Sequence, residues 1–132
     1  MPIHGIGVDI LHVPRLASLF ARRPSRLASR ILSVDELSIY NTLSTNEQLR
    51  VRFLAVRWAV KEAAYKALYP IRPTWKELTF TSMINGVKPS LLYHPSARPS
   101  ASSDASGNVG ALHVSVSHDG EYVFASVLAE AQ

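Results

Sequence analysis

The sequence predicts a single α+β domain in which one antiparallel sheet packs against one long helix plus shorter helices. Three patterns indicate this fold. Apolar side chains recur at helical intervals over roughly residues 46–69. Alternating apolar and polar residues on both sides of a turn at residues 118–120 indicate a β-hairpin, and a short apolar stretch at residues 3–10 indicates a buried strand. Strands and helices distributed in this way are typical of the α+β class.

The length and composition fit one folded domain over residues 1–132. A hydrophobic content of 47% and a charged content of 18% exclude a disordered or fibrous chain. The absence of cysteine excludes disulfides, thiolate metal sites and cysteine nucleophiles. Because the apolar runs are far shorter than the roughly 20 residues of a membrane span, we expect a soluble intracellular protein without a membrane partner.

The N-terminal part of the chain is expected to begin with a strand and a short helix. The apolar stretch at residues 3–10 predicts the strand. Pro14 is a favourable first residue of a helix, and Pro24 is expected to end that helix.

A second short helix and the long helix are expected to follow. Ser33 precedes Glu36 by three residues, which is the spacing of a capping box and predicts a helix through residue 43. The long helix over roughly residues 46–69 is expected to end at Pro70.

The C-terminal part is expected to consist mainly of strands. Residues 78–84 and 90–94 predict two strands. Residues 95–110 are rich in Ser, Ala, Pro and Gly, which indicates a flexible loop. Residues 112–117 and 122–128 form the two arms of the predicted hairpin.

Positive charge is concentrated in two regions of the chain, which has a net charge of +4 and a pI near 9.7. Such a surface suits a polyanionic partner, which could be nucleic acid, a phosphorylated cofactor or an acidic protein. A basic solvated face without any partner would have the same composition. The first region holds Arg15, Arg22, Arg23, Arg26 and Arg30, and the second holds Arg50, Arg52, Arg57 and Lys61.

Asp9 is an acidic residue near the end of an otherwise apolar strand. A carboxylate at a buried position is costly unless a cation or hydrogen bonds stabilise it. Asp9 is therefore a candidate metal ligand, although an aspartate that forms a turn or caps the helix after it is the more common explanation of such a residue.

Glu62 and Lys66 are four residues apart on the long helix and share one face with Trp58. An exposed ion pair, worth about 0.3–0.5 kcal/mol, is the simplest interpretation of this spacing. Alanines at positions 63, 64 and 67 keep the surrounding surface small, so that backbone or a ligand could approach closely. The helix could then present an acid and a base beside a cleft.

His118 lies at the turn of the hairpin, after a strand that carries Ser115 and Ser117. A single histidine at a turn is more often an ordinary surface residue. Together with Asp9 and Glu62, however, it would complete a site with two oxygen ligands for a hard cation. Two carboxylates suit Mg²⁺ that is bound jointly with a phosphorylated substrate. No P-loop, dinucleotide fingerprint, GxSxG or HExxH motif is present.

Three segments resemble the signatures of the holo-acyl-carrier-protein synthases, which are the short, single-domain class of 4'-phosphopantetheinyl transferases. These segments are GIGVDI at residues 5–10, FLAVRWAVKEAAYKAL at residues 53–68 and VSVSHD at residues 114–119. The resemblance covers nearly the whole chain in the same order, and WxxKExxxK is its most specific motif. It implies the 4'-phosphopantetheinyl transferase fold.

The resemblance also implies a reaction and a set of site residues. Asp9 and Glu62 would hold Mg²⁺ on the pyrophosphate of coenzyme A, and Lys66 would contact phosphate. His118, with Ser117 beside it, would help to bind coenzyme A. A serine of an apo-acyl carrier protein would attack the β-phosphate and expel 3',5'-ADP, which gives the holo-acyl carrier protein.

Several arginines match positions that the family uses for binding. Arg15 would meet the acidic helix of the carrier protein, and Arg22 and Arg26 would extend the same electrostatic fit. Arg50 and Arg57 would contact the phosphates of coenzyme A. The family also implies a homotrimer with active sites between neighbouring subunits.

Some positions depart from the family pattern. Leu49 occupies a position that is often basic, and Val56 replaces a frequent glycine. The loop over residues 95–110 is longer than in compact bacterial members. These departures favour a eukaryotic, fungal mitochondrial version located in the mitochondrial matrix.

Two alternatives remain open at this stage. One is a transferase domain of a larger fatty acid synthase, which would share the motifs. The other is a basic module that binds nucleic acid. We expect no nucleic acid partner, because acidic residues in a phosphate-binding groove repel phosphates unless a metal intervenes.

Overall fold

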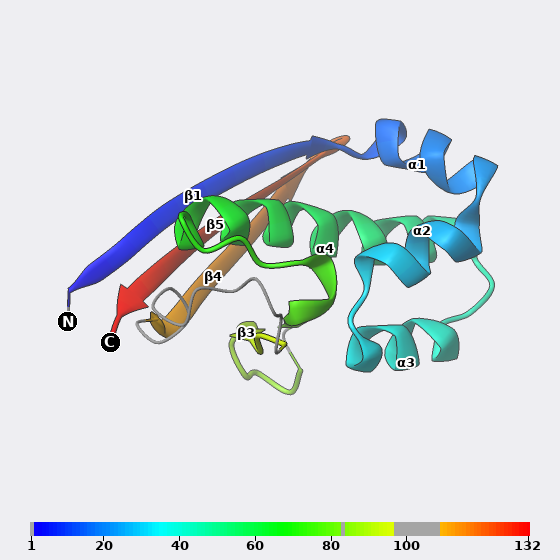
Figure 1. Ribbon diagram of the computed structural model, residues 1–132. Helices are drawn as coiled ribbons and strands as arrows, with labels where there is room; N and C mark the ends of the chain where they lie inside the picture. Colours follow the sequence, from blue (N-terminus) through cyan, green and yellow to red (C-terminus); the bar gives the residue numbers. More distant parts are fainter. Residues whose placement is uncertain (1, 83, 97–108) are drawn as a thin grey trace.

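The computed structural model describes residues 2–82, 84–96 and 109–132 (Figure 1). The predicted α+β class is confirmed, but within these residues the strands form two antiparallel sheets rather than one. The first sheet has the strand order β1-β5-β4, and the second pairs β2 with β3. The elements in chain order are β1 (Ile3–His12), α1 (Val13–Arg22), α2 (Pro24–Ile31), α3 (Val34–Thr42), α4 (Glu47–Leu68), the 3-10 turn η1 (Trp75–Glu77), β2 (Leu78–Thr81), β3 (Ser90–Tyr93), β4 (Val109–Asp119) and β5 (Tyr122–Ala131).

The long helix α4 covers one face of the three-stranded sheet, and the three short helices gather near the end of the sheet where β1 leads into α1 (Figure 1). The predicted periodicity of α4 is confirmed, with Asn46 as its N-cap. The Leu49 N–H donates to Asn46 Oδ1 at 3.1 Å. The core lies between α4 and the inward residues of the sheet, such as Leu11 and Val127.

β1 approaches α4 unusually closely. A Cβ atom on Gly7 would lie 2.0 Å from the Ala63 carbonyl oxygen, and one on Gly5 would lie 2.2 Å from the Ala67 carbonyl oxygen. Glycine on the strand and alanine on the helix therefore allow backbone to pack against backbone, as the small residues of α4 indicated.

Pro24 does not simply end a helix. α1 ends at Arg22, as predicted, but Pro24 is the first residue of α2, a helix that the sequence interpretation missed. Proline lacks the amide hydrogen that the first turn of a helix leaves unpaired, so it begins a helix as readily as it ends one.

The capping box of α3 is confirmed: Ser33 Oγ accepts from the Glu36 N–H, and Glu36 Oε1 accepts from the Ser33 N–H.

The hairpin is longer than expected. β4 continues through Asp119, so His118 lies inside the strand, and Gly120 (φ 56°) supplies the left-handed residue of the turn.

Other predicted boundaries also change. β2 ends at Thr81 rather than at residue 84. Most of the loop predicted over residues 95–110 lies outside the described residues. Within the described part of the chain, no helix is long and apolar enough to cross a membrane.

Candidate active site

Asp9, Glu62 and Lys66 meet where β1 crosses α4. Asp9 alternates with Val8 and Ile10 along β1, so its side chain faces α4 while theirs face away from it. Lys66 Nζ lies 3.7 Å from Asp9 Oδ1 and donates to the Val8 carbonyl oxygen at 2.9 Å. The structure thus brings together an acid from the strand and an acid and a base from the helix, as the sequence predicted.

The two carboxylates are held in an environment that disfavours their negative charge. Burial raises the pKa of Asp9, and the positive charges of Lys66 and Arg15 only partly oppose this. Burial also raises the pKa of Glu62, and the negative charge of Asp9 raises it further. Two half-buried carboxylates that repel each other form a site that a cation would stabilise.

The donor set fits Mg²⁺ that is shared with a phosphorylated ligand. Asp9 and Glu62 offer hard oxygen ligands, which Mg²⁺ prefers, and they are too few to enclose a metal by themselves. Among the described residues, no cluster of three or more His, Cys, Asp or Glu side chains could hold a metal ion. The remaining ligands would therefore come from water and from the phosphates of a substrate.

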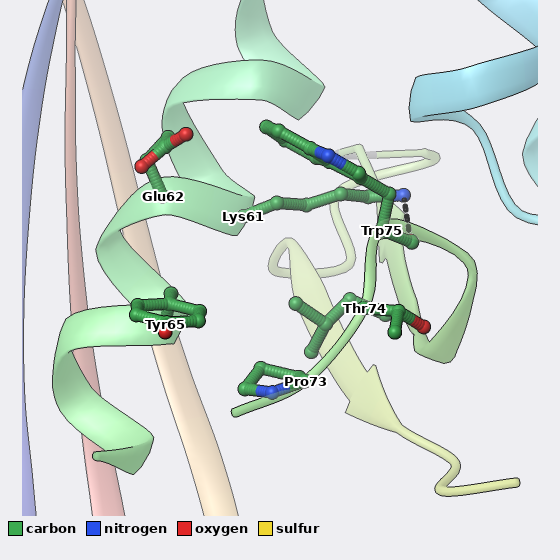
Figure 2. Close-up of a pocket in the computed structure, with 7 residues that line it drawn as sticks. Lys61, Glu62, Tyr65, Pro73, Thr74 and Trp75 are labelled. Atoms are coloured by element: carbon green, nitrogen blue, oxygen red, sulfur yellow. Dashed lines mark hydrogen bonds between the residues drawn. The ribbon is translucent and has the colours of Figure 1, made fainter. Parts of the chain in front are cut away.

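A cavity of about 340 Å³ opens beside Glu62. One wall is α4, and the other is the segment that leads into β2 (Figure 2). In Figure 2, Tyr65 faces this segment across the cavity, while Glu62 lies at the rim. The cavity is lined by Lys61, Glu62, Tyr65, Pro73, Thr74, Trp75 and Leu78. The sequence interpretation did not single out Tyr65 or Trp75, because an isolated aromatic residue gives no local signal that it lines a cavity.

Arg57 is not at this site. Its side chain is only 6% exposed, its Nε lies 3.9 Å from Glu36 Oε2, and its guanidinium lies 3.6 Å from the centre of the Phe53 ring. Burial lowers the pKa of Arg57 to about 10, against the opposing charge of Glu36. The expected contact of Arg57 with coenzyme A phosphates does not fit this buried position, which is a correction to the sequence interpretation.

Arg50 lies near the start of α4, about 18 Å along the helix from Glu62 at 1.5 Å per residue. Its Nε donates to the Ser44 carbonyl oxygen at 3.3 Å, and its guanidinium lies 5.0 Å from the centre of the Tyr40 ring. Arg50 is therefore held in place at some distance from the two carboxylates, where it could only reach another part of an extended ligand.

His118 and Ser117 lie on the far edge of the sheet, since β5 separates β4 from β1. His118 pairs with Val123, so it shares the inward face with Asp9 but lies at the exposed end of β4. Ser117 pairs with Phe124 and faces away from α4. One chain alone does not bring these two residues into the Asp9 and Glu62 site.

The three predicted docking arginines lie exposed on α1 and α2. Arg15 is in the first turn of α1, close enough to the site for its charge to oppose in part the rise that burial causes in the pKa of Asp9 and of Glu62. Arg22 and Arg26 border a shallow groove that also contains apolar side chains. The groove is lined by Leu19, Arg22, Arg23, Arg26, Leu27 and Arg30.

Comparison with known proteins identifies the family. A sequence model described as the 4'-phosphopantetheinyl transferase superfamily matches residues 5–125. The chain belongs to this superfamily. It is 38% identical to the holo-acyl-carrier-protein synthase of Desulfovibrio desulfuricans over 134 aligned residues, which cover 98% of each chain. It is also 38% identical to the synthase of Edwardsiella ictaluri, covering 98% of this chain and 99% of that one.

Solved structures of transferases in this superfamily have the same fold. The synthase of Neisseria meningitidis has a TM-score of 0.77 at 28% identity, covering 97% of this chain and 98% of that one. A synthase from Chronobacterium ammoniagenes, solved as a complex with CoA, has a TM-score of 0.68 at 29% identity and 97% coverage of both chains. The predicted fold and enzyme class are therefore confirmed.

Proposed function

We propose that this transferase moves the 4'-phosphopantetheine arm of coenzyme A to a serine of an apo-acyl carrier protein. The serine gives up its proton to water as its oxygen attacks the β-phosphorus, the bond from that phosphorus to the bridging oxygen breaks, and 3',5'-ADP leaves. The observation that carries this proposal is the pairing of Asp9 and Glu62 beside Lys66, in a chain of this superfamily. The similar chain solved with CoA supports coenzyme A as the co-substrate.

Asp9 and Glu62 are the residues that would hold Mg²⁺ in this site. When bound, Mg²⁺ would neutralise the charge that develops on the leaving pyrophosphate oxygen. Its binding would also relieve the repulsion that raises the pKa of Glu62. The two carboxylates come from different elements, so the contact of β1 with α4 sets their separation.

Lys66 is positioned to act on the phosphates. Its side chain is 56% exposed, and its ammonium already makes a hydrogen bond to the Val8 carbonyl oxygen. Phosphoryl transfer is catalysed mainly by positioning and by charge neutralisation, so a lysine fixed beside two metal ligands is an expected part of such a site.

The carrier protein would dock on the basic surface of α1 and α2. Arg15, Arg22 and Arg26 present positive charge, and the groove beside Arg22 and Arg26 contains the apolar side chains of Leu19 and Leu27, against which a side chain of the carrier could pack. Electrostatic complementarity of this kind accelerates encounter with an acidic partner. Arg15 lies at the end of this surface nearest to Asp9 and Glu62, which would direct the carrier serine to the reacting phosphate.

Assembly into a homotrimer is also proposed. The face of the three-stranded sheet opposite α4 is apolar and exposed to solvent. On this face Ile6 is 68% exposed and Ile10 is 64% exposed, and Val8 and Phe124 are also exposed. Monomeric proteins seldom leave such a surface in water. An interface on this face would cover it and could supply the groups that one chain does not bring to the site.

The transfer is tested by intact-mass spectrometry of an apo-acyl carrier protein after incubation with the chain, coenzyme A and either Mg²⁺ or a chelator. The expected result is a gain of one phosphopantetheine that requires Mg²⁺ and disappears in Glu62→Gln. A folded protein that modifies no carrier under any of these conditions would refute the proposal.

Docking and assembly have separate tests. Arg15→Glu is expected to raise the KM for the carrier while the KM for coenzyme A changes little, and unchanged carrier kinetics would remove Arg15 from the docking surface. Light scattering after size exclusion is expected to give three times the chain mass.

Location of the protein in the mitochondrial matrix remains a prediction, which localisation of a tagged chain in its native cell would check.

A further inference from the structure

The connection between α1 and α2 combines an exposed surface with a high density of positive charge. Arg22 and Arg23 are the only adjacent pair of arginines in the sequence, and Pro24 and Ser25 follow them directly. Residues 21–26 are all exposed. Figure 1 shows the junction of the two helices at the edge of the molecule, on the side away from both chain ends. This segment is therefore open to another protein.

The positive charge of this region is not neutralised by nearby acids. Residues 10–34 contain no aspartate or glutamate. Four arginines line the groove that α1 and α2 form, and none of them makes an ion pair with another described residue. The groove holds Arg22, Arg23, Arg26 and Arg30, with Leu19 and Leu27 between them. A modification that adds negative charge here would change the surface strongly.

Ser25 has the sequence surroundings of a phosphate acceptor. It follows Arg23 by two residues and Arg22 by three, at the start of α2. Protein kinases select their substrates partly by charge, and a kinase with an acidic substrate groove pairs with basic residues near the acceptor hydroxyl. The two adjacent arginines offer such a kinase both charge contacts on the N-terminal side of one serine.

Two neighbouring serines share part of this pattern but are held inside helices. Ser18 and Ser29 each follow a single arginine by three residues. The Ser18 hydroxyl donates to the Pro14 carbonyl oxygen at 3.2 Å, and the Ser29 hydroxyl donates to the Arg26 carbonyl oxygen at 3.0 Å. A kinase takes its substrate as an extended segment, so modification of either serine would require a helix with buried residues to unwind.

Ser25 needs a much smaller opening. Arg23, on its N-terminal side, already has non-helical backbone angles of φ −150° and ψ 72°. The Leu27 N–H donates to the Arg23 carbonyl oxygen at 3.0 Å, and this hydrogen bond of the first helical turn is the one that the opening would break. Exposed helix ends open locally at little cost in free energy. Ser25 is thus the most accessible acceptor of the three serines.

We propose that Ser25 is a phosphorylation site for a kinase that prefers basic substrates, and that its phosphate weakens docking of the acidic carrier protein at this groove. In the modification, Ser25 Oγ attacks the γ-phosphorus of ATP, and the bond from that phosphorus to the bridging oxygen breaks. ADP leaves, and the hydroxyl proton passes to the catalytic aspartate of the kinase. The effect on docking rests on the proposed function, whereas the modification itself does not.

The added charge is large compared with the charge of the groove. A phosphoserine carries about −1.5 to −2 at neutral pH, which offsets about half of the charge of the four arginines. Consecutive Cα atoms are about 3.8 Å apart, so the Cα atoms of Arg23 and Arg26 lie within about 8 Å of that of Ser25, about one Debye length in physiological salt. Negative charge in the first turn of a helix is stabilising, so the fold should be retained.

The site is tested by incubating the whole chain with ATP and the catalytic subunit of cyclic-AMP-dependent protein kinase, which requires arginine before its acceptor serine. Intact-mass spectrometry counts the phosphates. We expect one phosphate in the wild type, in Ser18→Ala and in Ser29→Ala, and none in Ser25→Ala. A wild type that takes no phosphate, or a Ser25→Ala chain that takes as much as the wild type, would overturn the site.

The effect on docking is measured by transfer kinetics before and after phosphorylation. We expect the KM for the carrier to rise at least about fivefold at low ionic strength, while the KM for coenzyme A and the Tm change little. The rise should shrink near 1 M salt, where charges are screened over about 3 Å. Ser25→Ala treated with the kinase is the matched control and should keep the unmodified kinetics.

An unchanged carrier KM in the phosphorylated chain, or a rise that salt does not reduce, would overturn the effect on docking. The proposed function fails differently, because an unmodified chain that transfers nothing to any carrier refutes it. The mass measurement on Ser25 still decides the modification site in that case.

Discussion

Substitution of Gly7 by alanine is the sharpest test of how the site is built. The added Cβ would lie 2.0 Å from the Ala63 carbonyl oxygen and 2.8 Å from the Ala67 nitrogen, whereas ordinary contact begins at 3.4 Å. Both of these atoms belong to the backbone of α4, so no side-chain rotation relieves the overlap. β1 and α4 must therefore separate by about 1 Å or more at the point where Asp9 faces Glu62.

The expected effects follow from that separation. Overpacking of this kind destabilises a protein by about 1–3 kcal/mol. For a chain of this length, that corresponds to a fall in Tm of about 4–12 °C. Misplacement of catalytic groups by about 1 Å lowers turnover by about 100-fold. We therefore expect Gly7→Ala to lose much more activity than its remaining folded fraction would explain.

The assay pairs thermal unfolding with the initial rate of carrier modification. Gly110→Ala is the matched control, since its Cβ would come no closer than 3.3 Å to a neighbouring atom in the same sheet. It should keep nearly wild-type stability and turnover. The reasoning is refuted if Gly7→Ala is as stable and as active as this control, because β1 could then move from α4 without consequence for the site.

Three further predictions concern charge. Because burial raises the pKa of Asp9 and of Glu62, the folded protein without metal binds protons more tightly than the unfolded chain, and its stability falls as the pH rises through the raised values. Glu62→Gln should therefore raise the Tm at neutral pH with a chelator present while it abolishes transfer, and a lower Tm would contradict this. The acidic limb of the transfer rate should lie above the ordinary carboxyl pKa of about 4, and raising Mg²⁺ should move it to lower pH. Glu36→Ala should cost about 3–5 kcal/mol in urea unfolding, since it leaves its partners Lys61 and Arg57 buried without a carboxylate, and a loss below about 1 kcal/mol would contradict that role.

The sequence predicted those parts of the molecule that depend on nearby residues. The spacing of Glu62 and Lys66 places them on one face of a helix whatever surrounds it. Asp9 was recognisable because an acid interrupts an apolar strand, and the small residues of α4 explained how that strand could approach. The capping box of Ser33 and Glu36 fixed the start of α3 by the same local logic.

The parts that were missed depend on partners far away in the chain. Arg57 occurs in a motif with the composition of a phosphate ligand, but Glu36, which is 21 residues earlier, pairs with it inside the core. Trp75 lines the cavity beside Glu62, and its carbonyl oxygen accepts a hydrogen bond from Lys61, a contact that no local pattern encodes. Pro24 was ambiguous for a different reason. Proline is tolerated both in the first turn of a helix and just after the end of one, so the residue alone does not show which of the two it marks.

Lys61 and Glu62 show why the central motif needs two adjacent charged residues of opposite sign. Successive residues of an α-helix point about 100° apart, so neighbours in the sequence enter different surroundings. Lys61 enters the interior and donates a hydrogen bond to the Trp75 carbonyl oxygen, while Glu62 lies at the rim of the cavity, where the charge of Asp9 acts on it. Exchanging the two residues would bury a carboxylate beside Glu36 and place an ammonium where the metal is expected. The net charge would be unchanged, yet both the buried hydrogen bonds of Lys61 and the cation site would be lost.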